Sequence, residues 1–289
     1  MPPLVSVAIP LHRSVRFLPV IFDNIDNLTY PNLEVLVSDR HGLDDAIHRI
    51  ADRYRGDSRV RILQSDDAIG WVDHYNLLAR EANGEFFMWM PHDDSFPAGY
   101  LERLIEPMMA HQQVGLCYGD VEPVSLDGIR RQGWRYAGTP GVKSSPPGLF
   151  RAMAFYMVHP WVPFRGLVRR SIMINRGLFI EHCRGEFGAD VNWVMSMLHA
   201  APLMHVSGVS CVKRFYPEST HRATPIDERA IRSSAGSLAR AVRRTGCSPL
   251  HARSLAVFAY VYRHLQWLRL VDALPDSLVR RVKSRVQRK

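Results

Sequence analysis

The sequence predicts an α/β fold in which helices flank a mostly parallel central sheet. Its first half alternates short apolar runs with amphipathic stretches, the pattern of strands joined by crossover helices. Gly56-Asp57 and Asn83-Gly84 follow two of the helical stretches, where a left-handed residue is easily accommodated. With 289 residues, 46% of them hydrophobic and 22% charged, the chain can bury a full core and resembles neither disordered nor fibrous proteins.

The expected elements of the first half follow one another in a regular order. Strands are predicted at 4–10, 33–38, 59–64, 85–90 and 114–119, from their apolar runs. Helices are predicted at about 15–28, 43–55, 71–82 and 98–111, from their amphipathic spacing. This alternation favours a single α/β unit that ends near residue 120.

The pattern changes after residue 120. Residues 121–148 are rich in glycine, proline and serine, and Asp127-Gly128 is a hairpin turn signal. Further strands are expected at 163–168 and 205–212, and a helix at 188–200. The second part of the chain is therefore expected to mix strands and helices irregularly.

The last part of the chain, from about residue 225, is helical in pattern and strongly basic. It contains fourteen Lys and Arg against four Asp and Glu, so the net charge of +9 resides there. Two interpretations remain open: a helical appendage packed on the domain, or a basic element at a membrane surface. One apolar face is expected to consist of Leu250, Leu255, Val257, Phe258, Val261, Leu265, Leu268 and Val271.

The sequence also bears on the cellular compartment. The apolar run at 4–10 is too short for a membrane span and lacks the basic segment of a signal peptide, so we expect a buried strand. Cys117, Cys183, Cys211 and Cys247 form no CxxC pair and show no metal-ligand spacing, which favours reduced thiols in a cytoplasmic protein. We expect the protein in the cytoplasm or at the inner face of the plasma membrane.

Two adjacent carboxylates follow the apolar run at 85–90. Asp93 and Asp94 come where a strand should end, and open α/β sheets bind ligands at the carboxyl ends of their strands. Adjacent carboxylates repel each other unless a cation or hydrogen-bond donors compensate them. A divalent ion shared with phosphate oxygens would do so, and a solvated loop or helix cap is the alternative.

Four further residues are candidates for the same site. Asp39 ends the second strand, where an acid can accept from a ring N–H or a ribose hydroxyl. Asp190 opens a helix, so it is either an N-cap or a general base aimed into a cleft. Trp193 could stack on a sugar, and the Arg214 guanidinium suits phosphate oxygens.

Three blocks of the sequence, in this order and at this spacing, resemble the opening of family 2 glycosyltransferases. The blocks are VSVAIP at 5–10, YPNLEVLVSD at 30–39 and ANGEFFMWMPHDD at 82–94. The resemblance is strong over about residues 4–120. It continues more weakly through 165–170, Asp190 and 213–216.

The resemblance implies a GT-A fold and a metal-dependent, inverting transfer of a sugar from a nucleoside-diphosphate sugar to an acceptor hydroxyl. It assigns donor binding to Pro10, Asp39 and Asp93 and the catalytic base to Asp190. Beside these we expect Leu11, Arg13 and Arg214 to take part in donor binding and Trp193 in acceptor binding. The metal ion, Mn or Mg, would be bound by Asp93 and Asp94. Because Pro91 replaces the first acid of an Asp-x-Asp element, Asp94 is the expected direct ligand.

The same resemblance divides the chain and names its partners. Residues 1–120 would bind the nucleotide sugar, 121–224 would hold the acceptor and the base, and 225–289 would form the basic helical tail. The acceptor would be a carbohydrate or a lipid-linked molecule in glycan or polysaccharide biosynthesis, with peripheral membrane contact through the tail. No nucleic-acid partner is expected.

Two other classes of function were weighed against this one. A sugar-nucleotide nucleotidyltransferase also uses an α/β sheet with a metal-binding acid, but it would carry a glycine-rich basic loop where this chain has Pro10-Leu11-His12-Arg13. Neither GxGxxG nor GxxxxGK[ST] occurs. A membrane-surface binding module is indicated only by the basic tail.

Overall fold

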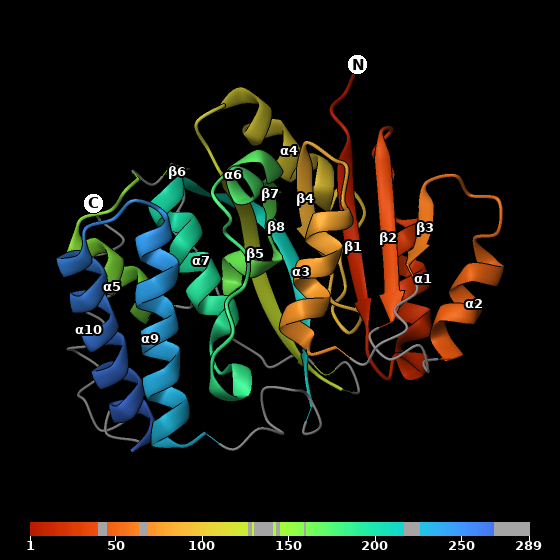
Figure 1. Cartoon of the computed structure of the whole chain (residues 1–289). Helices are drawn as coiled ribbons and strands as arrows, with labels where there is room; N and C mark the ends of the chain where they lie inside the picture. Colours follow the sequence, from red (N-terminus) through yellow and green to blue (C-terminus); the bar gives the residue numbers. More distant parts are fainter. Residues whose placement is uncertain are drawn as a thin grey trace.

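The fold is an α/β layer structure built on one large sheet (Figure 1). The computed structural model describes residues 1–39, 45–63, 69–126, 129, 141–142, 145–158, 160–216 and 226–268. Eight strands form the sheet in the order β3-β2-β1-β4-β7-β5-β8-β6. Short β7 runs antiparallel to both β4 and β5, so β4 and β5 point the same way, as do β1, β2, β3 and β8. The predicted, mostly parallel sheet is confirmed.

The first half contains the predicted elements in the predicted order. The strands are β1 (Val5–Leu11), β2 (Leu33–Asp39), β3 (Val60–Leu63) and β4 (Phe86–Trp89). The helices are η1 (Val15–Phe17), α1 (Leu18–Asp26), α2 (Asp45–Arg53), α3 (Trp71–Glu81) and α4 (Tyr100–Ala110). All seven residues of β1 are buried, because neighbouring strands cover both its edges and helices cover both its faces.

The second half departs further from the prediction. Its elements are β5 (Leu116–Ser125), β6 (Gly141–Val142), α5 (Leu149–Met157), η2 (Val162–Arg165), β7 (Leu167–Arg169), α6 (Arg170–Asn175), η3 (Arg184–Glu186), α7 (Ala189–Ala200) and β8 (Leu203–Phe215). The strand expected at 163–168 is a 3-10 turn followed by a three-residue strand. The prediction missed α5 and α6. The expected hairpin turn at Asp127-Gly128 lies outside the described residues.

The C-terminal region forms two helices, α9 (Glu228–Arg244) and α10 (Pro249–Trp267). Asp227 caps α9 by accepting from the Ala230 N–H at 2.7 Å, and α9 packs on α7, where Asn192 Nδ2 donates to the Ser234 carbonyl at 2.9 Å. Figure 1 shows the pair at the end of the molecule opposite α2 and β3. The helical appendage is thus joined to α7 by a packed interface.

The apolar face expected on α10 is divided between two sides of the helix. Leu255 and Ala259 are buried, whereas Leu250, Val257 and Val261 are 77%, 63% and 48% exposed. The prediction is wrong for Leu255, because α10 packs through Leu255 and small alanines, and Val271 lies outside the described residues. Among the described residues, no helix combines the length and apolar character needed to cross a membrane.

Candidate active site

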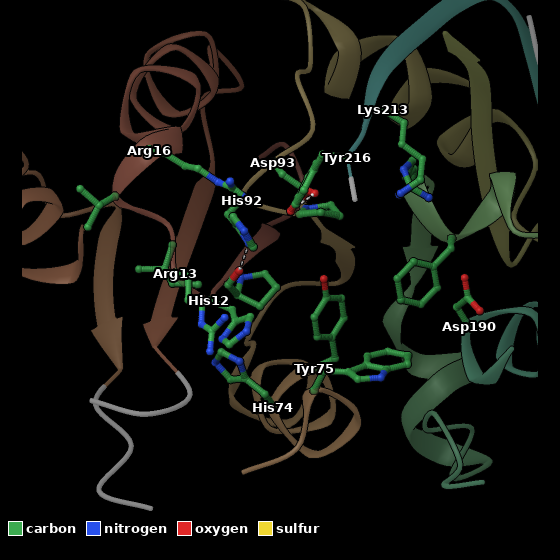
Figure 2. Close-up of a pocket in the computed structure, with 17 residues that line it drawn as sticks. His12, Arg13, Arg16, His74, Tyr75, His92, Asp93, Asp190, Lys213 and Tyr216 are labelled. Atoms are coloured by element: carbon green, nitrogen blue, oxygen red, sulfur yellow. Dashed lines mark hydrogen bonds between the residues drawn. The ribbon is translucent and has the colours of Figure 1, made fainter. Parts of the chain in front are cut away.

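A cavity of about 620 Å³ opens at the carboxyl ends of β1, β4 and β8 (Figure 2). These strands run in the same direction, so their ends meet at one edge of the sheet, where α/β folds bind ligands. The cavity is lined by Pro10, Leu11, His12, Arg13, Val15, Arg16, Trp71, His74, Tyr75, Pro91, His92, Asp93, Phe164, Arg165, Asp190, Lys213 and Tyr216. Residues from Pro10 to Tyr216, more than 200 positions apart in the sequence, therefore form one pocket.

The loop that carries Asp93 and Asp94 is held from two sides. On one side, Asn24 of α1 donates to the Asp94 carbonyl and accepts from the Phe96 N–H, each at 2.9 Å. On the other, Ser95 pairs with Val212 of β8 through two backbone hydrogen bonds of 2.9 and 2.8 Å. The loop is thus fixed relative to β8 before any ligand arrives.

Asp94 does not line the cavity. Its side chain is 0% exposed, and Arg165 Nε donates to its Oδ2 at 2.6 Å, while the Arg214 N–H donates to Oδ1 at 3.3 Å. Both carboxylate oxygens therefore already have partners inside the protein. The expectation that Asp94 is the direct metal ligand is wrong in this structure, because Arg165 already compensates its charge.

Asp93 is the carboxylate of the pair that faces the cavity. The Tyr216 hydroxyl donates to its Oδ2 at 3.0 Å. Burial disfavours the charged form, but His92, Lys213, Tyr216 and Arg165 together hold the pKa of Asp93 below its ordinary value. Asp93 therefore offers an ionised carboxylate to a ligand at neutral pH.

His92 offers a second potential ligand atom, its ring nitrogen Nε2, beside the Asp93 carboxylate. Its Nδ1 lies 3.1 Å from the Pro10 carbonyl, which can only accept, so Nδ1 carries the proton. Nε2 is buried without a hydrogen-bond partner among the described residues. This nitrogen is free to accept from a hydroxyl of a ligand or to bind a cation.

Four basic side chains line the cavity: Arg13, Arg16, Arg165 and Lys213. The Arg16 guanidinium lies 4.8 Å from the Phe17 ring centroid and 4.7 Å from that of Tyr216, which fixes its direction. Burial and the neighbouring Arg165 lower the pKa of the Lys213 ammonium. Because Asp94 already offsets Arg165, the remaining lining charges are Arg13, Arg16 and Lys213 against Asp93 and Asp190. This small positive excess suits a polyanion such as a diphosphate.

Asp190 lies on the opposite wall of the cavity from Arg13 and His12, in the first turn of α7 (Figure 2). Gly188 precedes it with φ of 71°, a conformation that favours glycine. No hydrogen bond to the Asp190 carboxylate is formed within the described part of the chain, and α7 has no side-chain cap. The N-cap alternative is therefore excluded, and the carboxylate is available to accept a proton from a ligand.

Trp193 is a core residue. It is 1% exposed, its indole N–H donates to the Leu178 carbonyl at 2.9 Å, and its ring packs edge-on against Trp89 with centroids 4.9 Å apart. The expectation that it stacks on the acceptor is wrong, because it points into the core one turn beyond Asp190. Trp71 and Tyr75 of α3, Phe164 and Tyr216 are the aromatic residues that do line the pocket.

Two expected donor-binding residues lie outside the cavity wall. The Arg214 guanidinium donates to the Asp93 carbonyl and to Ser95 Oγ, each at 2.9 Å, so it braces the loop and does not line the pocket. Asp39 is 1% exposed at the end of β2, in register with Leu11, and is also absent from the lining. By contrast, Pro10, Leu11 and Arg13 line the cavity as expected.

A divalent ion would find one protein carboxylate here. In the part of the chain that the structure describes, no three His, Cys, Asp or Glu ligands converge in this pocket. Mg²⁺ commonly binds through one or two carboxylates together with substrate phosphates, so Asp93 and two phosphates form a suitable donor set. The fit therefore depends on the donor's own oxygens.

Comparison with known proteins identifies the family. The model described as "Glycosyl transferase family 2" matches residues 6–185, which is more than half of the chain. The chain belongs to glycosyltransferase family 2. The match covers the loop with Asp93 and Asp94 and ends just before α7.

Relatives with known names match part of this family 2 chain. The Escherichia coli protein named UDP-Glc:alpha-D-GlcNAc-diphosphoundecaprenol beta-1,3-glucosyltransferase WfgD is 27% identical over 126 residues, 44% of this chain and 49% of that protein. Glycosyltransferase GlyG of Streptococcus pneumoniae serotype 4 is 28% identical over 107 residues, 37% of this chain and 35% of that protein. The chain thus spans half or less of these relatives.

The fold of this family 2 member is that of a solved GT-A structure. S. aureus TarS, in complex with UDP-GlcNAc, superimposes with a TM-score of 0.68 at 14% identity and covers 91% of this chain and 73% of the TarS chain. Because 91% of this chain is covered, the structural similarity to the GT-A fold extends beyond residues 6–185, the part matched by the family model. At this identity the comparison shows the fold alone.

Sequence reasoning missed several residues of the glycosyltransferase pocket, namely Arg16, His74, Tyr75, Arg165 and Lys213. For Lys213 a signal existed: side chains alternate along a strand, so Lys213 and Arg214 of β8 must face opposite sides, and only one could reach the cavity. For the α3 and η2 residues the sequence carried no signal, because their approach to β4 depends on the tertiary packing.

Proposed function

We propose that this glycosyltransferase moves a sugar from a nucleoside-diphosphate sugar to an acceptor hydroxyl with inversion at the anomeric carbon. The observation that carries the proposal is the cavity in which one carboxylate, Asp190, lies across from Arg13 and Arg16, with Lys213 on its own side (Figure 2). S. aureus TarS, which has the same fold, has been crystallised with UDP-GlcNAc and with UDP. This supports a nucleotide-sugar donor of the same kind.

In this proposal the Asp190 carboxylate acts as the general base. An acceptor hydroxyl is a weak nucleophile, so a base within hydrogen-bond reach must take its proton as attack proceeds. The acceptor oxygen then forms a bond to the anomeric carbon while the bond from that carbon to the diphosphate oxygen breaks. Attack on the face opposite the leaving group inverts the anomeric centre.

The departing nucleoside diphosphate needs its negative charge stabilised. Arg13, Arg16 and Lys213 line the cavity and present preorganised cations for this purpose. Asp93 would hold a Mn or Mg ion together with the two phosphates, and the bound ion would supply further charge neutralisation of the leaving group. The fixed Asp93–Ser95 loop keeps that carboxylate in place.

A donor screen tests this function directly. Titration calorimetry with UDP, GDP and dTDP, each with manganese and with EDTA, should show one nucleotide that binds more tightly when manganese is present. The matching nucleotide sugars should then release that nucleotide in the presence of an acceptor. Failure of all three nucleotides to bind would contradict the proposal, whereas equal binding with EDTA would contradict only the metal dependence.

We further propose that the acceptor is lipid-linked and that α10 rests on an anionic membrane surface, at the inner face of the plasma membrane. Leu250, Val257, Val261 and Leu268 are spaced by seven, four and seven residues, which places them on one side of a helix. These side chains are between 47% and 77% exposed, and the chain from residue 225 onward is strongly basic. The name of WfgD specifies an undecaprenol-linked acceptor for that relative.

The triple substitution Leu250→Ser, Val257→Ser and Val261→Ser should reduce sedimentation with vesicles that contain phosphatidylglycerol. Each buried aliphatic side chain contributes about 1.5–3 kcal/mol, so we expect the bound fraction to fall roughly tenfold or more. Met109→Ser on α4, which also removes an exposed apolar side chain, serves as the control. Equal sedimentation of the triple variant and the wild type would contradict the proposed contact between α10 and the membrane.

A further inference from the structure

A second group of metal-binding side chains lies at the opposite end of α7 from Asp190. His199 is in the last turn of α7, Cys247 is in the turn between α9 and α10, and His251 is in the first turn of α10. Their ligand atoms all lie within 4.8 Å of one another. Nine residues of helix place this group about 14 Å from Asp190, well outside the active-site cavity.

The distances in this group fit a tetrahedral ion. The two Nε2 atoms of His199 and His251 are 3.2 Å apart. Zinc binds imidazole nitrogen at about 2.0–2.1 Å, which puts two tetrahedral nitrogen ligands about 3.3 Å apart. The imidazole pair therefore already has the separation that a shared ion requires, and rotation of the Cys247 side chain would complete three ligands.

The orientation of His199 supports the same conclusion. Its Nδ1 lies 2.7 Å from the Met195 carbonyl, which can only accept, so Nδ1 carries the proton and Nε2 presents its lone pair to His251 and Cys247. Metal-binding histidines commonly donate their second ring nitrogen to a carbonyl in this way. His199 is also 3% exposed, so the ring is held in place by the surrounding protein.

We propose that His199, Cys247 and His251 bind a zinc ion that fastens the α9–α10 pair to α7. Two imidazoles and one thiolate suit zinc better than magnesium or calcium, which prefer oxygen ligands. The Cys247 thiol loses its proton to solvent when the ion binds. A cavity of about 460 Å³ that His199 and Cys247 line adjoins these ligands, and it leaves room for a water molecule as the fourth ligand.

This site has a structural consequence that is independent of sugar transfer. The three ligands come from α7, from the α9–α10 turn and from α10, so one ion would join the C-terminal helices to the helix that carries Asp190. Because an ion that binds only the folded state stabilises that state, zinc should raise the melting temperature of the full-length protein.

Cobalt(II) provides a direct test, because a cobalt–thiolate bond gives a charge-transfer absorption in the near ultraviolet. Protein dialysed against EDTA and then freed of it should develop this band, together with tetrahedral visible bands, at one equivalent of cobalt chloride, and zinc should abolish it. The active-site cavity is lined by no cysteine, so cobalt bound beside Asp93 cannot produce the band. Absence of the band in the wild type would overturn the proposal.

Substitutions at the ligands sharpen the test. Cys247→Ser should lose the charge-transfer band, and His251→Gln should lower cobalt affinity, whereas His48→Gln, an exposed histidine on α2, should change neither. Zinc should also slow the reaction of the native protein with a thiol reagent, since Cys247 is half-buried and the other three cysteines are buried. A band that persists in Cys247→Ser, or a thiol reactivity unchanged by zinc, would also overturn the site.

Discussion

Replacing Asp190 with asparagine should lower the turnover number by roughly two to four orders of magnitude, the usual contribution of a general base. The amide is nearly isosteric with the carboxylate but cannot take a proton from the acceptor. Because Asp190 lies across the cavity from Arg13, the affinity for the donor should change little. Steady-state assay of nucleotide release, together with calorimetry of the donor, measures the two quantities separately.

The control for this variant has to separate chemistry from folding. Arg263 of α10 lies near Asp190 and donates to the Tyr156 hydroxyl at 3.0 Å, so loss of the carboxylate leaves a half-buried guanidinium with one fewer opposite charge. The melting temperature of Asp190→Asn should therefore be recorded beside its activity. Asp23→Asn, at an exposed position of α1, should match the wild type, and full transfer by Asp190→Asn would refute the assignment of the base.

Asp93→Asn should impair metal-dependent donor binding, whereas Asp94→Asn should lower the stability of the fold. Asp93 faces the cavity, so Asp93→Asn should abolish the manganese dependence of donor binding and most of the sugar-transfer activity. The melting temperature of this variant should stay near that of the wild type. Asp94 is buried against Arg165, so Asp94→Asn leaves the buried Arg165 guanidinium without a compensating charge. We expect the free energy of unfolding to fall by about 3–5 kcal/mol.

Calorimetry with and without manganese and denaturant unfolding distinguish the two variants. The pair acts as its own matched control, because the two residues are adjacent and the chemical change is identical. If Asp94→Asn keeps its stability and loses manganese-dependent binding, the roles of the two carboxylates are exchanged. Unaltered donor binding in Asp93→Asn, with and without manganese, would remove the metal site from this loop.

The N-terminal half of the fold could be predicted because its signals are local. Strands such as β1 and β4 are continuous apolar runs, and the helices between them carry regular amphipathic spacing. The second half was harder to predict, since β7 has only three residues and lies between β4 and β5, which come from distant parts of the chain. A strand of that length has no periodicity that sequence reasoning can detect.

The candidate site could likewise be predicted from the sequence only in part. The positions of Asp93 at a strand end and Asp190 at a helix start were readable, and both line the cavity. Trp193 was misassigned because a tryptophan one turn from a catalytic acid can point either to the ligand or to the core. Only the packing of Trp89 and Phe164 around it places it in the core.

The sequence by itself indicated the family, the mostly parallel sheet and the sheet edge that carries the candidate site, because the motif blocks and the strand ends are local features of the sequence. Only the tertiary structure decided which carboxylate of the adjacent pair is free. Asp93 and Asp94 are chemically identical neighbours, and what distinguishes them is Arg165, which is 71 residues away from Asp94 in the chain and 2.6 Å away in space. Such a partner is set by packing between distant segments, which no local pattern encodes.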